Sequence, residues 1–205
     1  MGKRSTFARR ARDFYPTPSS AAVPLLRHLP DGVRYWEPCA GDGALIDALA
    51  PRARCIVATD IAPGREGIYR SDVLQVPQGD ILSVGLDMIV TNPPWPMPGQ
   101  GGAPVTTLVD HLAAVRPLWL LLAWDVAAND YFERLRTICP VIVPIGRVSW
   151  QGNGLKGKDN AAWYLFDGRV RVGGPVVLGS LGRTAPSIHA AALRRTRCAA
   201  TAVAA

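Results

Sequence analysis

A regular alternation of short apolar runs with segments of helical periodicity constrains the fold of this chain more than any other feature. The sequence predicts strands and helices in alternation: strands at 34–40, 54–60, 67–73, 86–92 and 117–124, and helices at 41–51, 104–115 and 129–138. An earlier short helix is predicted at 21–29, after two serines that can cap it. Strands that alternate with helices form right-handed crossovers, and so predict a mostly parallel sheet with helices on both faces.

Two further strands are predicted at 140–150 and 161–167, with a polar loop and no helix between them. Strands connected in this way form an antiparallel hairpin, which belongs at one edge of the sheet. The sequence therefore predicts an α/β fold with a mostly parallel, seven-stranded sheet. Ligands of such open sheets bind beyond the carboxyl ends of the strands, so residues at those ends are the first candidates for function.

Length and composition indicate one ordinary domain. The chain has 205 residues, of which 48% are hydrophobic, enough for a sizeable core. Its net charge of +7 favours a polyanionic partner such as nucleic acid, although many basic proteins bind none. The cysteines, Cys39, Cys55, Cys139 and Cys198, show neither a metal-ligand spacing nor a disulfide framework. We expect a reduced, cytoplasmic protein with no metal ion and no membrane segment.

The two ends of the chain differ from its middle. Residues 1–12 carry five basic side chains and little that can pack, which predicts a flexible basic arm, or simply a solvated terminus. The predicted domain covers residues 13–169. Residues 170–205 are rich in arginine, alanine and glycine, so they predict only a basic C-terminal extension, either with an extra strand and a helix or disordered.

Polar residues stand where the first three predicted strands end. In the stretch EPCAGDG, Glu37, Gly41 and Gly43 lie in a turn from strand to helix, where glycines let a ligand approach the backbone closely. Asp60 ends the second strand, where a carboxylate can accept both hydroxyls of a ribose. Asp72 ends the third strand and can accept a hydrogen bond from an adenine amine. An ordinary turn explains each residue alone, but three acidic strand ends in succession favour a ligand site.

The fourth predicted strand ends in the stretch TNPPW, residues 91–95. Pro93 and Pro94 remove two backbone donors and fix two backbone angles, so this segment cannot continue as a central strand. It predicts a rigid strand exit that carries Asn92 and Trp95. The alternative is an Asx-type turn beside a core tryptophan.

These segments, EPCAGDG, ATDI, RSDVL and TNPPW in that order, resemble the motifs of S-adenosylmethionine-dependent adenine methyltransferases of the class I Rossmann-like fold. DFYPTP before the glycine turn, and GRVSW and AAWYLFD after the prolines, extend the resemblance over about residues 13–167. Small DNA adenine-N6 methyltransferases of phages and prophages resemble the sequence most closely. The resemblance implies transfer of a methyl group from S-adenosyl-L-methionine to the N6 amine of adenine in DNA, with S-adenosyl-L-homocysteine as product.

The resemblance also implies a role for each motif. Asn92 and Pro93 would accept the two hydrogens of the target amine, and Pro94 would help to keep these acceptors rigid. Trp95 would stack on a base that is flipped or unpaired. The implied cofactor site is made of residues from the same motifs: Tyr15, Thr17, Glu37, Gly41, Gly43, Asp60, Ile61, Asp72, Val73 and Asn92.

Residues outside these motifs complete the expected substrate site. Trp150 matches an aromatic position in the family and would line the base pocket, or is a core residue. Lys156 and Lys158 would contact phosphates, or are merely solvated. Segment 96–104 is rich in glycine and proline and is expected to be a lid or a linker. Asp87 begins its strand, far from the carboxyl end, so we assign it no catalytic role.

Two departures from the family limit what the resemblance implies. Tryptophan stands at position 95, where DNA-modifying members more often have tyrosine or phenylalanine, and a separate target-recognition domain is not apparent. The target sequence therefore cannot be read from the chain. Three alternatives stay open: methylation of adenine in RNA, methylation of a glutamine amide in protein, and a non-catalytic module that binds cofactor or DNA.

Overall fold

The computed structural model describes residues 14–95, 104–151 and 160–178. The predicted arm 1–12, the segment 96–103, Lys156, Lys158 and residues 179–205 lie outside these described residues. The strands are β1 Val33–Glu37, β2 Ala53–Asp60, β3 Tyr69–Arg70, β4 Met88–Thr91, β5 Leu118–Ala123, β6 Val141–Gly146, β7 Ala161–Phe166 and β8 Val176–Val177. The helices are α1 Ser19–Leu26, α2 Ala44–Leu49, α3 Gln78–Ser83, α4 Val105–Leu112 and α5 Phe132–Arg136, with 3-10 turns η2 Val73–Gln75 and η3 Trp124–Ala128.

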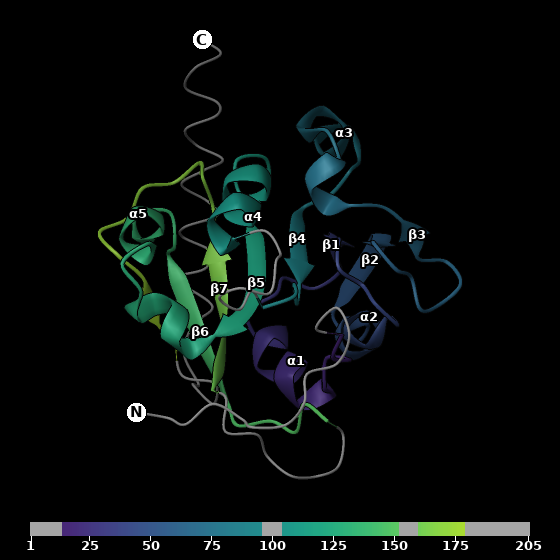
Figure 1. The fold of residues 1–205 in the computed structure, drawn as a ribbon, viewed down its shortest axis with the longest axis horizontal. Helices are drawn as coiled ribbons and strands as arrows, with labels where there is room; N and C mark the ends of the chain where they lie inside the picture. The colour runs from purple at the N-terminus through teal and green to yellow at the C-terminus, as the bar shows by residue number, and fades with distance from the viewer. Residues whose placement is uncertain (1–13, 96–103, 152–159, 179–205) are drawn as a thin grey trace.

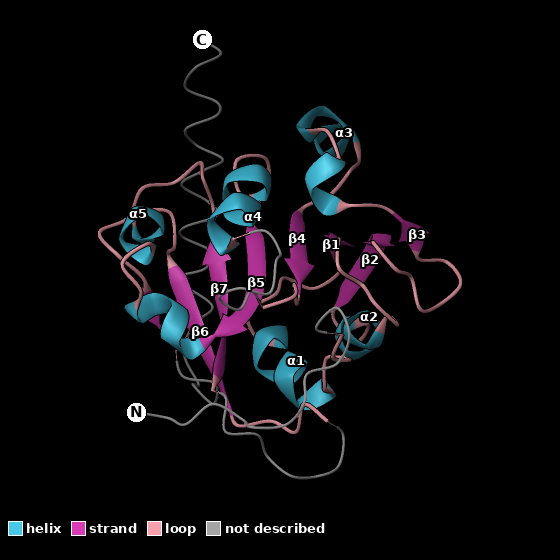
Figure 2. Cartoon of the chain, viewed as in Figure 1, coloured by secondary structure: helices cyan, strands magenta, loops and turns pink. Residues whose placement is uncertain are grey.

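The strands form one sheet in the order β3-β2-β1-β4-β5-β7-β6-β8, with helices around it (Figures 1 and 2). Neighbouring strands pair in parallel, except that β7 is antiparallel to both β5 and β6. This confirms the predicted α/β fold with an antiparallel hairpin. The hairpin does not end the sheet, however, because the two-residue strand β8 pairs with the outer side of β6.

The two larger apolar clusters of the core lie one on each face of the sheet, and a small third one contains Ala40, Ala58 and Ile68. Strand β5 is buried along almost its whole length and alternates between the two clusters: Trp119 and Leu121 face α1 and α2, while Leu118 and Leu120 face α3, α4 and α5. A strand covered on both faces is expected to be a continuous apolar run, as this one is. The indole N–H of Trp163 in β7 donates to the carbonyl of Ala21 at 2.8 Å, which fixes α1 against the sheet.

The structure corrects several details of the sequence prediction. The sheet has eight strands within the described residues, not seven, because β8 lies in the expected C-terminal extension. Helix α3 was not predicted. Ser19 and Ser20 are the first residues of α1 and not its caps, since Pro18 holds the N-cap position and makes no side-chain capping bond. No helix among the described residues has the length and apolar character needed to cross a bilayer.

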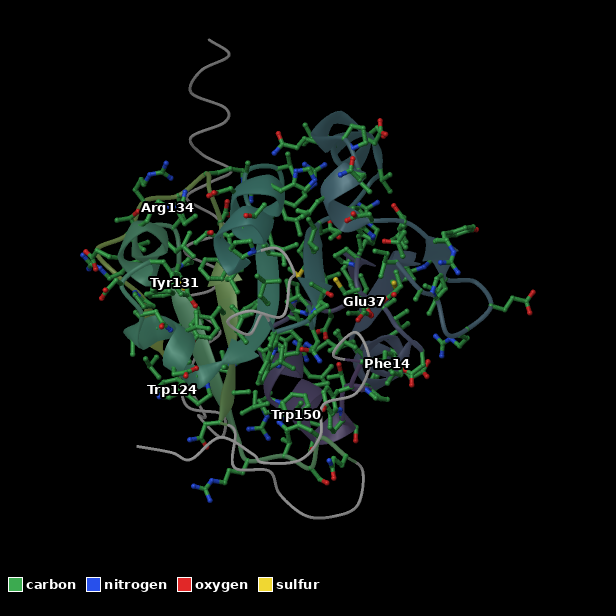
Figure 3. All side chains as sticks on the ribbon, viewed as in Figure 1. Phe14, Glu37, Trp124, Tyr131, Arg134 and Trp150 are labelled. Atoms are coloured by element: carbon green, nitrogen blue, oxygen red, sulfur yellow. The ribbon has the colours of Figure 1, made fainter. Side chains whose placement is uncertain are left out.

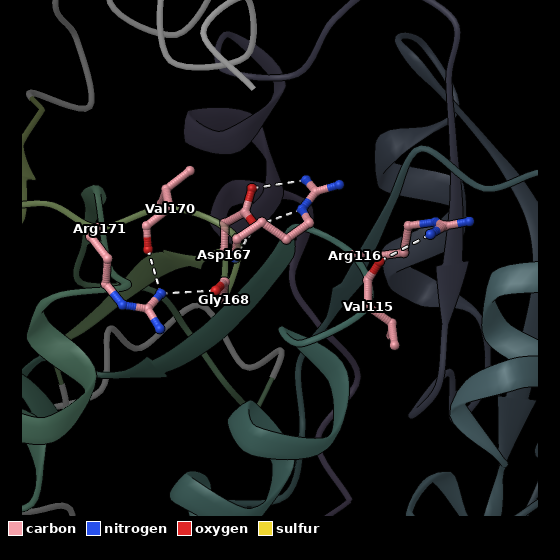
Figure 4. Close-up of polar contacts among 7 residues, drawn as sticks. Val115, Arg116, Asp167, Gly168, Val170 and Arg171 are labelled. Carbon is pink, nitrogen blue, oxygen red and sulfur yellow. Dashed lines mark hydrogen bonds and ion pairs between the residues drawn. The ribbon is translucent and has the colours of Figure 1, made fainter. Parts of the chain in front are cut away.

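Ion pairs and turns hold the edge of the sheet opposite the carboxyl ends of the parallel strands. Asp87 accepts hydrogen bonds from the backbone and the guanidinium of Arg34 at 2.8 to 3.3 Å, which joins the start of β4 to β1. Asp167 follows β7, is 5% exposed, and pairs with Arg169 at 2.8 Å, while Arg171 donates to the carbonyl of Gly168 (Figure 4). Asp87 therefore has a structural contact, consistent with the absence of a catalytic assignment.

Candidate active site at the carboxyl ends of the strands

The carboxylate of Asp60 connects the ends of β1 and β2. Its Oδ2 accepts a hydrogen bond from the backbone N–H of Gly41 at 2.8 Å, and its Oδ1 accepts one from Ala62 at 2.7 Å. The backbone N–H of Ala40 donates to the carbonyl of Thr59 at 2.9 Å beside it. Each carboxylate oxygen has a second lone pair, so Asp60 can hold the glycine turn and still accept hydroxyls of a ligand.

Two positions of this turn require glycine, because a side chain would not fit there. Gly41 has φ +56° and Gly43 has φ +81°, in the left-handed region. A Cβ on Gly41 would lie 2.6 Å from the ring of Phe14, and one on Gly43 would overlap the guanidinium of Arg65. Arg65 also pairs with Asp47 of α2 at 2.8 Å. Arg65 was not identified from the sequence, and Phe14 was identified only as part of the DFYPTP segment and not as a site residue, because both reach the turn only through the tertiary fold.

Glu37 is a buried acid at the end of β1. Its side chain is 1% exposed, and its Oε2 has no hydrogen-bond partner in the structure. Burial raises the pKa of Glu37 well above its ordinary value, and the nearby Asp60 and Asp42 raise it further. A buried acid with an unused acceptor among other carboxylates is suited to a positively charged ligand group.

The exit of β4 is tied to the segment that precedes α1. The amide Nδ2 of Asn92 donates to the hydroxyl of Thr17 at 3.1 Å, and Thr17 is 7% exposed. This contact joins positions 75 residues apart and uses the amide nitrogen, which leaves the amide oxygen Oδ1 for another donor. Tyr15, from the same segment, packs against the cluster on this face of the sheet.

Two tryptophans form the wall next to Asn92. The indole N–H of Trp95 donates to the carbonyl of Leu121 in β5 at 3.0 Å. The rings of Trp95 and Trp150 meet edge to face, with centroids 5.3 Å apart and planes at 73°. Trp95 is half-buried, whereas Trp150 is 8% exposed and belongs to the core cluster. Trp150 is thus a core residue that touches Trp95, and its role in lining a base pocket stays a prediction.

The remaining predicted cofactor residues lie along the ends of β2 and β3. Ile61 is 60% exposed and directly follows Asp60. Asp72 is exposed, and its Oδ1 accepts the backbone N–H of Leu74 at 3.0 Å, so it caps η2, in which Val73 is half-buried. This is the turn role that the sequence left open, and a ligand role for Asp72 stays a prediction.

The parallel pairing of β2, β1, β4 and β5 brings these residues to one edge of the sheet. Figure 3 shows Glu37, Phe14 and Trp150 on this side of the molecule. The edge offers three things: backbone and carboxylate acceptors around the glycine turn, a buried acid, and an amide held beside an aromatic wall. Among the described residues, no group of three or more His, Cys, Asp and Glu side chains is placed to hold a metal ion.

No protein-family model matches the sequence, and no curated protein matches it. Solved structures share its fold. A chain of a type I restriction-modification system is 15% identical, with a TM-score of 0.52 over 84% of this chain and 46% of that one. A candidate RNA methyltransferase from Pyrococcus horikoshii is 12% identical, with a TM-score of 0.56 over 80% and 92%.

A third similar structure is a candidate class I S-adenosylmethionine-dependent methyltransferase from Listeria monocytogenes, 12% identical, with a TM-score of 0.52 over 92% of this chain and 72% of that one. The chain spans less than half the length of the restriction-modification protein. At these identities the likeness concerns the fold alone, which is that of class I methyltransferases.

Proposed function

We propose that this protein transfers a methyl group from S-adenosyl-L-methionine to the N6 amine of adenine in DNA. The observation that carries the proposal is the hydrogen bond from Asn92 to Thr17 beside Trp95. It fixes an amide at the rigid exit of β4 with its oxygen free to accept a proton of an amine. The other strand ends supply the acceptors that a charged nucleoside cofactor requires.

The cofactor is supported by the fit of the residues around the glycine turn. The unpartnered Oε2 of Glu37 suits the ammonium group of the cofactor's methionine part, and the carboxylate of Asp60 suits its ribose hydroxyls. The missing side chain of Gly41 makes room for the ring of Phe14 in the glycine turn. Phe14 lies over that turn and is 40% exposed, so it can close on the ligand from the solvent side.

Catalysis in this proposal consists of positioning. The bound cofactor supplies a sulfonium methyl group that is already electrophilic. Asn92 Oδ1 and the Pro93 carbonyl accept the two N–H groups of the target amine, which turns its lone pair toward the methyl carbon. With the cofactor held around the glycine turn, methyl transfer would replace its carbon–sulfur bond with a carbon–nitrogen bond, and the amine would then lose a proton to water. Trp95, held by Leu121, stacks on the base.

The distribution of charge supports a nucleic-acid substrate that is held chiefly by segments outside the described residues. The described residues contain 12 arginines, no lysine and 14 aspartates and glutamates, so they are net acidic. The other 11 basic residues lie in the segments outside the described part, with only Asp13 and Asp159 as acids. Phosphate contacts are therefore expected chiefly from segments such as the N-terminal arm and Lys156 and Lys158.

Replacing Asp60 with alanine is expected to weaken cofactor binding about 5- to 150-fold, because a ribose hydroxyl pair loses its acceptor at a cost of about 1 to 3 kcal/mol. Isothermal titration calorimetry with S-adenosyl-L-methionine measures this change. Asp80→Ala removes an exposed carboxylate at the start of α3 and is the matched control, with wild-type affinity expected. An unchanged affinity in Asp60→Ala would remove Asp60 from the cofactor site.

Deleting residues 1–12 is expected to make DNA binding less sensitive to salt. Each phosphate contact that is lost reduces the slope of log K against log salt by about 0.9. Five basic residues in this arm predict a reduction of about 1 to 4, measured by fluorescence anisotropy over a salt series. A chain with glutamine at the five basic positions should behave like the deletion, and an unchanged slope in both would refute the role of the arm.

The proposed activity is tested by offering a labelled methyl donor to unmethylated DNA, RNA and protein together. Label in adenine of DNA would support the proposal as stated. Label in RNA adenine, or in a glutamine side chain of protein, would keep the site and change the substrate. A chain that binds the cofactor without transferring label would be a non-catalytic module.

A further inference from the structure

A groove of about 700 Å³ lies on the face of the sheet that α3, α4 and α5 cover. Its walls come from η3, α5, β6 and β8, and include Trp124, Phe132, Ile142 and Val177. Phe132 and Ile142 belong to the cluster under α3, α4 and α5, whereas Trp95 and Trp150 pack against the other cluster. The groove is therefore separate from the strand-end site.

Exposed apolar side chains gather around this groove. Trp124 and Val177, which line the groove, are 39% and 55% exposed, and Tyr131, between the lining residues Asp130 and Phe132, is 41% exposed. Figure 3 shows Trp124 and Tyr131 on the same side of the molecule. Neighbouring exposed apolar residues in such a patch indicate a surface that another segment covers.

The floor of the groove is held in place. The backbone N–H of Trp124 donates to the carbonyl of Asn160 at 2.9 Å, and the hydroxyl of Tyr164 donates to the carbonyl of Trp124 at 3.0 Å. Phe132 and Tyr164 pack edge to face with centroids 6.0 Å apart. A surface that is fixed before binding loses little conformational freedom when it is covered.

The last described residues of the chain, 175–178, lie at the wall of the groove. Pro175 and Val177 line it, and the last described residue, Leu178, donates its backbone N–H to Ile142 at 2.9 Å. Twenty-seven residues, 179–205, follow directly. A segment attached at the edge of a binding surface reaches it at a high effective concentration, which favours it over any separate partner.

The composition of residues 179–205 complements the groove. The segment contains the apolar residues Leu181, Ile188 and Leu193, four arginines and no acid. The groove and η3 carry Asp125, Asp130 and Glu133 against the single cation Arg136, which is already paired with Glu133 at 2.8 Å. We propose that residues 179–205 of this same chain dock in the groove, with apolar side chains on its floor and arginines at its acidic rim.

The test compares the full chain with a chain that ends at residue 178, each with and without Val177→Arg. Val177 is exposed, so arginine there should block the groove without disturbing the core. Truncation is expected to lower Tm by at least about 3 °C and to increase binding of an apolar dye. Val177→Arg should lower Tm similarly in the full chain and have no effect in the truncated chain. Deletion of residues 1–12 is the control and should leave Tm unchanged.

A synthetic peptide of residues 179–205 should restore Tm when added to the truncated chain, and should do so less well at high salt. The same peptide with glutamine in place of its four arginines should restore it poorly. Several results would overturn the proposal: an unchanged Tm on truncation, an equal effect of Val177→Arg in both chains, or a Tm that rises with protein concentration together with dimer formation, which would make a second copy the occupant.

Discussion

Asn92→Ala is expected to reduce the rate of methyl transfer about 100- to 1,000-fold, because the target amine loses the acceptor that orients it in the transition state. Cofactor affinity should fall far less than the rate, since Asn92 is only one of the ten residues of the implied cofactor site. The two effects are separated by measuring single-turnover methyl transfer with saturating cofactor, and cofactor binding by calorimetry.

The bond between Asn92 and Thr17 provides a graded control for this prediction. Thr17→Val keeps the shape of the side chain but removes the oxygen that Asn92 Nδ2 meets at 3.1 Å, so we expect a smaller loss of rate than in Asn92→Ala. Thr17→Ser restores the oxygen and should recover most of the rate. Wild-type activity in Asn92→Ala would remove the proposed role of Asn92.

Glu37→Gln is expected to weaken cofactor binding about 10- to 100-fold, since a hydrogen bond to a charged group contributes about 1.5 to 3 kcal/mol. The same substitution should stabilise the cofactor-free protein above pH 5. Burial raises the pKa of Glu37 in the folded chain, so folding favours its protonated form. That contribution is fully present below the unfolded pKa and is lost as pH rises toward the folded pKa, whereas glutamine never ionises.

The two opposite effects of Glu37→Gln are measured by thermal unfolding at pH 5 and pH 8 without cofactor, and by calorimetry with it. The Tm difference between variant and wild type should be larger at pH 8 than at pH 5. Glu66→Gln, at an exposed position, is the control and should change neither quantity. If Glu37→Gln had a lower Tm than wild type at pH 8 and an unchanged cofactor affinity, Glu37 would have a packing role alone.

The fold could be predicted from the sequence because short stretches of sequence indicate its strands and their connections. The apolar run of β5 and the missing helix before β7 are visible in the sequence, and they determine the parallel sheet and its antiparallel hairpin. Helix α3 was missed because its six residues carry one buried side chain, Ile81, which gives no periodicity to detect. Strand β8 has two residues and depends on its pairing with β6.

The sequence also indicated which strand ends would meet, but not the contacts between them. Asn92 and Asp60 could be identified because they directly follow apolar runs. Phe14 and Arg65 could not, since the turn that each covers lies about 20 to 30 residues away and only folding brings them together. The hydrogen bond of Asp60 to the glycine turn likewise shows a structural role that its position alone did not indicate.

The measurement that tests the central claim most directly is transfer of a labelled methyl group from S-adenosyl-L-methionine to a mixture of unmethylated DNA, RNA and protein, with the modified residue identified by mass spectrometry. The account predicts label at the N6 amine of adenine in DNA, and none with Asn92→Ala. The account would be contradicted if the wild-type chain bound the cofactor and labelled nothing, or labelled protein alone.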